Sequence, residues 1–375
     1  MTGPIVSPDP RTLVPLAPHS IIGILGGGQL AKMLVQAAAE LGFRSAIYSD
    51  DWGPALDVAG SHLIGPYDNL GRLDEFARGV DVVTYEFENV PVAAAVHLAR
   101  RVPVRPGPQA LRVAQDRAVE KSFIADLGIP VAPFIAIAGA GDVPAGVQAM
   151  KVWQGPAILK TARLGYDGKG QAGVAVPDDL AAAFAELGSV PSVLERRIDF
   201  ALEISVLVAR GLDGSLACYD APRNTHEGGI LRRSVVPAGL PAAIEDQARD
   251  IACRIAVALD YVGVLGVEMF CLGADAASPL LVNEIAPRVH NSGHWTMDAC
   301  AICQFQNHIR AVAGWPLGST QRHSDAEMRN LIGHDADDWQ SLAADAEACL
   351  HLYGKREARS GRKMGHVTRL TPRSR

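Results

Sequence analysis

The strongest constraint on the fold lies near the N-terminus, where short apolar runs alternate with a helical pattern. Residues 20–25 form an apolar run that ends at three successive glycines, Gly26, Gly27 and Gly28. Apolar residues then recur at helical spacing up to another glycine, and further apolar runs follow at 45–48 and 80–85. This strand–helix–strand alternation predicts a doubly wound parallel sheet over about the first 105 residues.

Later segments predict further elements and outline the domains. A helical pattern covers 109–127, short strands fill 130–200, and from position 202 strands alternate with helices at 241–259 and 296–314. We therefore expect an α/β domain followed by α+β domains. The expected parts are a loose N-terminal extension at 1–19, a Rossmann-like domain at 20–125, a small central domain at 126–200 and a C-terminal domain at 201–375.

Composition excludes several classes of function. The formal net charge of the 375-residue chain is −6, so a nucleic-acid-binding surface is not expected. No apolar run reaches the ~18 residues of a membrane span, and the proline-rich N-terminus lacks the apolar core of a signal peptide. We expect a cytoplasmic protein with reduced cysteines.

The glycine turn at 26–28 has more than one interpretation. The pattern Gly26-x-Gly28-x-x-Ala31, with Asp50 or Asp51 further on, fits the fingerprint of a dinucleotide-binding dehydrogenase. Glycines before a helix N-terminus suit any phosphorylated ligand equally well, because they let the backbone N–H groups approach a phosphate. A turn that binds nothing is the third possibility.

A second glycine-rich segment predicts a nucleotide site. Lys160 ends an apolar run and precedes a loop whose N–H groups can cradle phosphate oxygens. Downstream, Glu195 and Ile198 fall where an interdomain linker is expected, so their backbone groups could contact adenine, and Glu203 could accept hydrogen bonds from ribose or form a surface salt bridge. The phosphate loop comprises Gly165, Tyr166, Asp167, Gly168, Lys169, Gly170 and Gln171.

The most informative local signal is a pair of acids in two successive apolar strands. Glu268 lies in the run 264–270 and Glu284 in the run 280–285. A buried carboxylate without a partner is costly, so each requires a cation. The short connection predicts an antiparallel hairpin that brings the acids together, and with Asn283 they offer hard oxygen ligands for magnesium. Bridging of both acids by arginines is the alternative.

Two polar segments extend this candidate site. Arg288, His290 and Asn291 follow the second acidic strand, where they could neutralise and position an oxyanion or a phosphoryl group. The C-terminal end is basic, and is either a solvated tail or an anion site. The residues of that possible anion site are Lys355, Arg362 and Lys363.

Several segments together resemble a known enzyme family. They are GILGGGQLAKM, TYEFENV, QDRAVEK, ILKTARLGYDGKGQ, LERRIDFALE, NTHEGGILR, GVEMF, NEIAPRVHNSGHWT and YGKREARSGRKMGH. They resemble the ATP-grasp family of 5-(carboxyamino)imidazole ribonucleotide synthases, over residues 20 to 370. The resemblance implies a three-domain ATP-grasp ligase and a homodimer. It also implies ATP-dependent carboxylation of 5-aminoimidazole ribonucleotide by bicarbonate through carboxyphosphate, in purine biosynthesis.

The resemblance also implies roles for individual residues. Those implied for ATP are Arg117, Lys160, Gly165, Tyr166, Asp167, Gly168, Lys169, Gly170, Gln171, Glu195, Ile198, Glu203, His226, Asn283 and Glu284. Those implied for Mg²⁺, with Mn²⁺ as a substitute, are Glu268 and Glu284. Those implied for the ribonucleotide are Gln29, Leu30, Glu86, Lys355, Arg362 and Lys363. Those implied for catalysis are Arg288, His290, Asn291 and Lys355.

Three rivals remain at this point, of which a non-catalytic or regulatory relative is disfavoured because the residues that it would be expected to lose are all present. A formate-using transformylase of glycinamide ribonucleotide would share the front domain, the acid pair and the basic tail. A dehydrogenase would explain the glycine turn, but it leaves Glu268, Glu284 and the loop at 165–171 without a purpose.

Overall fold

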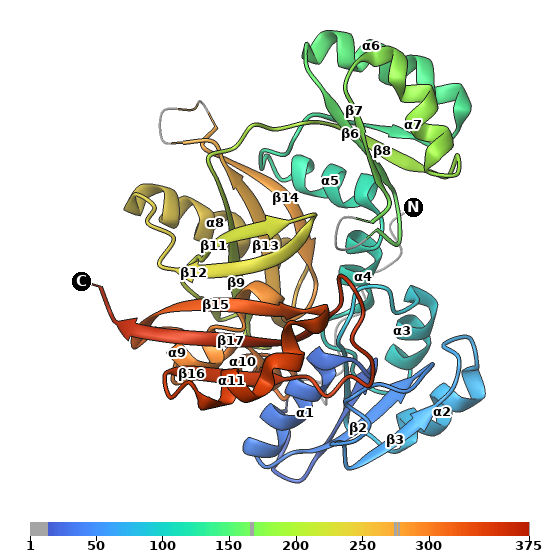
Figure 1. Ribbon diagram of the computed structural model, residues 1–375. Helices are drawn as coiled ribbons and strands as arrows, with labels where there is room; N and C mark the ends of the chain where they lie inside the picture. Colours follow the sequence, from blue (N-terminus) through green and yellow to red (C-terminus); the bar gives the residue numbers. More distant parts are fainter. Residues whose placement is uncertain (1–13, 166–168, 274–275, 277, 375) are drawn as a thin grey trace.

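The computed structural model describes residues 14–165, 169–273, 276 and 278–374, whose strands form three sheets (Figure 1). The N-terminal sheet has the order β3-β2-β1-β4, and its neighbouring strands are parallel. The predicted parallel α/β sheet is therefore confirmed. Its strands are β1 (Ile21–Leu25), β2 (Arg44–Ser49), β3 (Ser61–Ile64) and β4 (Val82–Tyr85).

Helices connect these strands and lead out of the domain. They are α1 (Gln29–Glu40), α2 (Leu70–Arg78), α3 (Val92–Ala99), α4 (Pro108–Ala114) and α5 (Arg117–Asp126). The prediction of a single helix at 109–127 is wrong, because the helix is interrupted between α4 and α5. Asp116 accepts hydrogen bonds from the N–H groups of Ala118 and Val119, and this N-cap starts a new helix.

The central part of the chain forms a small antiparallel sheet of order β5-β8-β6-β7. Its apolar face is covered by two helices, which pack Met150, Leu180 and Phe184 against Leu159 and Leu194. The elements are β5 (Phe134–Ile137), η2 (Ala140–Asp142), α6 (Val143–Trp153), β6 (Ala157–Thr161), β7 (Gln171–Val174), η3 (Pro177–Asp179), α7 (Leu180–Glu186) and β8 (Ser192–Arg196).

The largest sheet has the order β14-β13-β9-β11-β12-β15-β17-β16, with β10 paired to β9. Its strands are β9 (Leu202–Arg210), β10 (Leu216–Cys218), β11 (Arg223–Glu227), β12 (Ile230–Val236), β13 (Gly263–Cys271), β14 (Leu280–Ala286), β15 (Ser324–Ile332), β16 (Ala348–Leu352) and β17 (Lys363–Pro372). Its helices are α8 (Ala242–Ala258), η4 (Asn291–Gly293), α9 (Thr296–Ala299), α10 (Gln304–Val312), η5 (Gly333–Asp338) and α11 (Trp339–Ala344).

Helix α10 joins the N-terminal domain to this large sheet. Phe305 and Ile309 share one apolar core with Met33 and Leu34 of α1 and with Leu207 of β9. His308 of the same helix reaches both sides, because its Nε2 lies 2.8 Å from the Thr84 hydroxyl of β4 and its Nδ1 accepts a hydrogen bond from the Val264 N–H. These contacts hold the carboxyl end of the parallel sheet beside β13.

Two further expectations need correction. The helix predicted at 296–314 is divided into α9 and α10 by residues 300–303. Of the extension expected at 1–19, residues 1–13 lie outside the described part, and residues 14–19 are docked rather than loose. The Leu16 N–H donates to the Ala313 carbonyl, and the Leu16 carbonyl accepts from the Trp315 indole, each at 2.8 Å. None of the described helices combines the length and apolar character that crossing a membrane requires.

Candidate active site

The two predicted acids lie directly opposite each other on an antiparallel hairpin. Glu268 of β13 pairs with Glu284 of β14, and the register shifts immediately afterwards, so that Asn283 forms a β-bulge. Without this bulge Glu284 would share the face of Leu280 and Val282, which point into the apolar core. The extra residue turns Glu284 to the other face, where Glu268 also lies.

The two carboxylates experience different electrostatic surroundings. Burial, followed by the charge of Glu284, raises the pKa of Glu268 to about 8. Burial also opposes ionisation of Glu284, but Arg117 lies 2.9 Å from its Oε2 and lowers the pKa of Glu284 to about 2. Glu284 is therefore a stable anion, whereas Glu268 holds a proton at neutral pH until a cation approaches.

A histidine and a second acid complete the surroundings of Glu268. Glu203, His226 and Glu268 place one ligand atom each within 4.8 Å of one another, and His226 Nδ1 lies 2.9 Å from Glu203 Oε2. Since Glu203 is paired to His226 inside the site, the surface salt bridge considered from the sequence is excluded. His290 approaches from the loop after β14, with Nε2 3.0 Å from Glu268 Oε1 and Nδ1 2.8 Å from the Ser292 hydroxyl.

His290 is a neutral side chain in this arrangement. Burial, reinforced by the nearby charges of Arg288 and Lys363, lowers the pKa of His290 well below its usual range. A neutral ring with its proton on Nε2 donates to Glu268 and accepts the Ser292 hydroxyl at Nδ1. His290 is thereby oriented to hold or move a proton at Glu268.

Lysines gather around Glu195 at the border between the small and large sheets. Lys160 and Lys121 each place Nζ 3.1 Å from Glu195 Oε2. Burial disfavours the charge of Glu195, but Lys121 and then Lys160 lower its pKa. The expected linker position of Glu195 is wrong, because Glu195 is buried within β8. Ile198 does lie in the connection between β8 and β9.

Only the two ends of the predicted phosphate loop can be placed. Tyr166, Asp167 and Gly168 lie outside the described residues. Gly165 offers its carbonyl to Arg117 Nη2 at 3.4 Å. Gly170 has a φ of +69°, and a Cβ there would meet the Thr161 hydroxyl at 2.6 Å, so this end of the loop requires glycine.

The loop after β14 holds its polar residues through partners that sequence reasoning missed. Arg288 donates from Nε to the Glu88 carboxylate, so part of its charge is already matched. Asn291 and Asn330 exchange two side-chain hydrogen bonds of 2.9 and 2.6 Å. Arg288 is therefore paired with Glu88, and its pKa is also raised by the charges of Glu284 and Glu86.

The glycine turn of the first domain already holds an anion, which is the carboxylate of Glu86. Its two oxygens accept hydrogen bonds from the N–H groups of Gly28 and Ala31, and a Cβ at Gly28 would lie 2.5 Å from Glu86 Oε1. The dehydrogenase interpretation is wrong, because this carboxylate occupies the place of a pyrophosphate. Gln29 begins α1, whereas the side chain of Leu30 is buried in the core.

The basic segment between β16 and β17 reaches across to this turn (Figure 1). Arg356 stacks on Trp52, with its guanidinium carbon 3.8 Å from the ring centroid. The ammonium of Lys355 donates to the Lys363 carbonyl at 2.7 Å, and Arg362 donates to the Glu357 carbonyl at 3.0 Å. The segment is therefore folded against the first domain and is not a solvated tail.

Sequence analysis assigned no contact to two buried ionisable residues of α5, Glu120 and Lys121. Glu120 accepts a hydrogen bond from the Ile285 N–H at 2.5 Å, and Lys121 donates to the Asn283 carbonyl at 3.2 Å. Both contacts fix the bulged strand that carries Glu284. The signal was available in part, since Glu120 lies one helical turn before the buried Ile124 and so shares its inner face.

Three family profiles match consecutive stretches of the chain. The ribonucleotide synthetase preATP-grasp domain matches residues 20–115, the ATP-grasp domain matches 122–305, and the phosphoribosylaminoimidazole carboxylase C-terminal domain matches 326–374. With an acid pair beside clustered cations, these matches define the class: the chain is an ATP-grasp ligase.

Full-length relatives then define the family. The N5-carboxyaminoimidazole ribonucleotide synthase of Brucella melitensis is 49% identical over 362 residues, covering 96% of this chain and 98% of the relative. That of Pseudomonas aeruginosa is 44% identical, covering 92% and 93%. The chain belongs to the N5-carboxyaminoimidazole ribonucleotide synthase family, as its sequence motifs indicated.

Solved structures agree with this assignment over nearly the whole chain. The N5-carboxyaminoimidazole ribonucleotide synthetase from Thermus thermophilus has a TM-score of 0.85 and 42% identity, covering 93% of each chain. The N5-carboxyaminoimidazole synthase from Aspergillus clavatus, in complex with ADP and 5-aminoimidazole ribonucleotide, has a TM-score of 0.86 and 31% identity, covering 94% of each chain. The predicted ATP-grasp fold is confirmed.

Proposed function

We propose that this chain uses ATP and bicarbonate to carboxylate the exocyclic amine of 5-aminoimidazole ribonucleotide, a step of purine biosynthesis. ATP and bicarbonate would give carboxyphosphate and ADP, and the amine would then attack the carboxyl carbon and release phosphate. The observation that carries the proposal is a series of neighbouring charges that links the acid pair to the basic segment. Arg288 is near enough to both Glu284 and Glu86 for their charges to raise its pKa, and Arg288 and Lys355 both lower the pKa of Glu86.

Magnesium fits the acid pair. Glu268 and Glu284 lie opposite each other, and the buried Oδ1 of Asn283 has no hydrogen-bond partner among the described residues. Carboxylate and amide oxygens are the hard ligands that Mg²⁺ prefers, and Mn²⁺ accepts the same set. Glu268 and Glu284 would hold the ion, which when bound supplies positive charge that offsets the charge of the nucleotide phosphates.

Cationic side chains of the same region would bind and orient ATP. Lys160 and Arg117 lie beside Glu195 and Glu284, and their positive charges suit phosphate oxygens. We assign nucleotide binding to Arg117, Lys160, Gly165, Lys169, Gly170, Gln171, Glu195, Ile198, Glu203, His226, Asn283 and Glu284. Tyr166, Asp167 and Gly168 belong to the same assignment through the sequence resemblance alone.

The loop after β14 would handle the small oxyanion. Glu88 accepts a hydrogen bond from Arg288, and the remaining N–H donors of Arg288 can contact bicarbonate and the phosphoryl group that is transferred to bicarbonate. His290 is neutral and contacts Glu268, so it can hold or move a proton at that carboxylate. Asn291 is oriented by Asn330 and can position bicarbonate. Burial of this loop keeps water away from a carboxyphosphate that water would hydrolyse.

The opposite end would bind the ribonucleotide. Lys355, Arg362 and Lys363 offer cations for its phosphate, and Lys355 is close enough to Glu86 to lower the pKa that burial raises. Gln29 at the start of α1 offers a side-chain amide to the ligand, while Leu30 could contribute only through its backbone. Glu86 would act mainly by fixing the glycine turn, with its remaining lone pairs directed to the amine.

The proposal includes a cytoplasmic homodimer and domain boundaries near residues 125 and 200. The boundaries are supported by the spans of the three sheets, which draw their strands from 21–85, 134–196 and 202–372. Sedimentation equilibrium of the purified chain tests the dimer.

One assay tests the central proposal. ADP release is measured with bicarbonate, with and without 5-aminoimidazole ribonucleotide, and the carboxylated product is detected by retention of ¹⁴C from bicarbonate. The control pairs glycinamide ribonucleotide with formate. ADP release that depends on the control pair instead would assign the chain to the transformylase reaction.

A further inference from the structure

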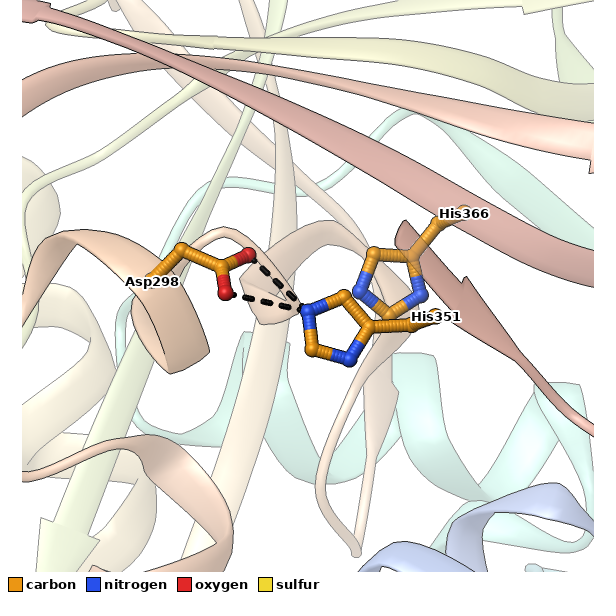
Figure 2. A group of neighbouring side chains, drawn as sticks. All are labelled: Asp298, His351 and His366. Atoms are coloured by element: carbon orange, nitrogen blue, oxygen red, sulfur yellow. Dashed lines mark hydrogen bonds and ion pairs between the residues drawn. The ribbon is translucent and has the colours of Figure 1, made fainter. Parts of the chain in front are cut away.

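A cluster of side chains outside the proposed active site has the composition of a metal site. Asp298 comes from α9, His351 from β16 and His366 from β17, and one ligand atom of each lies within 4.8 Å of the others. His351 Nε2 lies 3.0 and 3.2 Å from the two Asp298 oxygens (Figure 2). His351 and His366 are direct cross-strand neighbours, so the sheet register fixes their proximity.

His366 supplies the observation that points to a ligand. Its side chain is fully buried, and its Nδ1 is engaged by the Tyr353 hydroxyl at 2.9 Å. Its Nε2 is buried and has no hydrogen-bond partner in the described structure. Figure 2 shows this nitrogen directed toward His351 Nε2 and Asp298. A buried polar atom left unsatisfied costs about 1–3 kcal/mol, so its position requires an explanation.

A neighbouring cross-strand pair, Cys349 and Thr368, adds a second buried polar atom that has no hydrogen-bond partner among the described residues. Cys349 lies two residues before His351 on β16, and it is paired across the sheet with Thr368. The hydroxyl of Thr368 is buried and also lacks a hydrogen-bond partner among the described residues. Because alternate residues of a strand share a face, Cys349 lies on the face of β16 that carries His351.

We propose that Asp298, His351 and His366 bind one divalent transition-metal ion of the zinc class. Two imidazoles and a carboxylate are ligands typical of zinc, and imidazole is a poor ligand for magnesium. Tyr353 fixes the His366 ring from behind, as outer partners of metal-binding histidines do. The thiol of Cys349 or a water molecule would complete the four ligands.

Binding requires one ring to turn. The imidazoles of His351 and His366 stack with centroids 4.4 Å apart and an interplanar angle of 13°, so their lone pairs do not yet meet at one point. His351 is the ring that would turn, because its side chain is 27% exposed and β16 is the edge strand of the sheet, whereas His366 is fully buried. The same exposure gives the ion an entry path.

The ion would stiffen the support of the catalytic loop. The His366 ring packs against that of His294, with ring centroids 4.9 Å apart and an interplanar angle of 38°. The amide of Gln304 lies 3.0 Å from His294 and donates to the His290 carbonyl at 2.8 Å. The site is therefore structural, and it is separate from the cluster of Glu203, His226 and Glu268.

Cobalt provides the test, because Co²⁺ bound by nitrogen and oxygen ligands absorbs visible light and Zn²⁺ displaces it. Untagged, full-length protein is titrated with Co²⁺ in excess Mg²⁺. We expect one cobalt per chain, displaced by Zn²⁺, with affinity weakened about tenfold or more in Asp298→Asn and His351→Gln, and a similar loss in Tyr353→Phe. Circular dichroism confirms folding of each variant. Asp298 and His351 are partly exposed, so the test does not depend on substituting the buried His366.

Two control variants decide where cobalt binds. His334→Gln removes an exposed histidine that pairs with Asp337 at 2.8 Å but belongs to no cluster of three such ligands in the described residues, and it should leave the spectrum unchanged. His226→Gln removes one member of the cluster of Glu203, His226 and Glu268, and it should also leave the cobalt spectrum unchanged. Three outcomes would overturn the proposal. Cobalt binding could disappear only in His226→Gln, or it could persist undiminished in both Asp298→Asn and His351→Gln. The third outcome is that no binding occurs at micromolar cobalt.

Discussion

Glu268 and Glu284 face each other across β13 and β14, yet their carboxyl groups have opposite tendencies to ionise. Burial and the negative charge of Glu284 hold the pKa of Glu268 at about 8. Arg117 brings the pKa of Glu284 down to about 2 against the effect of burial. Two carboxylates at one site rarely ionise together without a cation, and here Arg117, followed by Lys160 and Lys121, favours the ionisation of Glu284.

Replacement of Glu284 by alanine should abolish ATP turnover. The variant would lose a ligand of the proposed metal site and leaves Arg117 without its carboxylate partner, so ADP release should fall at least about a hundredfold. Steady-state ADP release with bicarbonate measures the effect. Glu186→Ala, an exposed glutamate on α7, is the matched control and should retain normal turnover. Near-normal ADP release by Glu284→Ala would refute the assignment of the metal site.

Replacement of Lys355 by alanine should weaken the binding of 5-aminoimidazole ribonucleotide but not that of ATP. The KM for 5-aminoimidazole ribonucleotide should rise about ten- to a hundredfold, because a charged hydrogen bond to phosphate is lost, while the KM for ATP stays unchanged. Lys151→Ala at an exposed position of α6 serves as the control. An equal rise in both KM values would contradict the proposed ribonucleotide site.

Glu268 should make the metal-free protein less stable as the pH rises from 6 to 8, while the buried His290, His294, His308 and His366 oppose this near their unfolded pKa of 6.5, because burial lowers their pKa values. The folded-state pKa of Glu268, about 8, exceeds its unfolded value of 4.5, so its contribution is complete below pH 4.5 and is lost as the pH passes through 8. Glu120, with a pKa also raised to about 8 by burial and then by Glu284, acts in the same direction. Each group contributes at most about 1.4 kcal/mol per pH unit.

Urea denaturation in the presence of a chelator, at several pH values, measures this slope. Glu268→Gln and Glu120→Gln should each shift the slope toward greater stability at high pH, since an amide does not titrate. Added Mg²⁺ should stabilise the wild-type protein more at pH 8 than at pH 6, because the ion must displace the proton of Glu268. A slope that both variants retain would exclude these carboxyl groups as its source.

We expect Lys121 to contribute mainly to the stability of the fold and Lys160 mainly to the binding of ATP. Both ammonium groups lie 3.1 Å from the same oxygen of Glu195, but the Lys121 side chain is 1% exposed and also binds the Asn283 carbonyl, whereas that of Lys160 is 12% exposed. Lys121→Met should lower the free energy of unfolding by about 3 kcal/mol. Lys160→Met should mainly raise the KM for ATP. Paired denaturation and kinetic measurements on the two variants test this division, which equal losses of stability would contradict.

Much of the fold could be predicted because its signals are local. The apolar runs at 20–25 and 80–85 carry their own strand pattern, and the acids at 268 and 284 stand out against apolar strands. The break between α4 and α5 was missed because Asp116 is a weak signal within a continuous helical pattern. The bulge at Asn283 was also missed, since neither its residues nor their spacing differ from those of a regular strand.

The sequence by itself determined the parallel N-terminal sheet, the acid-bearing hairpin and the family, since each depends on residues close together in the chain. Only the tertiary structure decided which charges meet. Arg117 reaches Glu284 across 167 residues, and Arg288 reaches Glu88 across 200. The same holds for Glu86, which caps the glycine turn 58 residues before it. Charge pairing over such separations follows from how the sheets pack, because Coulomb attraction depends on distance in space and not along the chain.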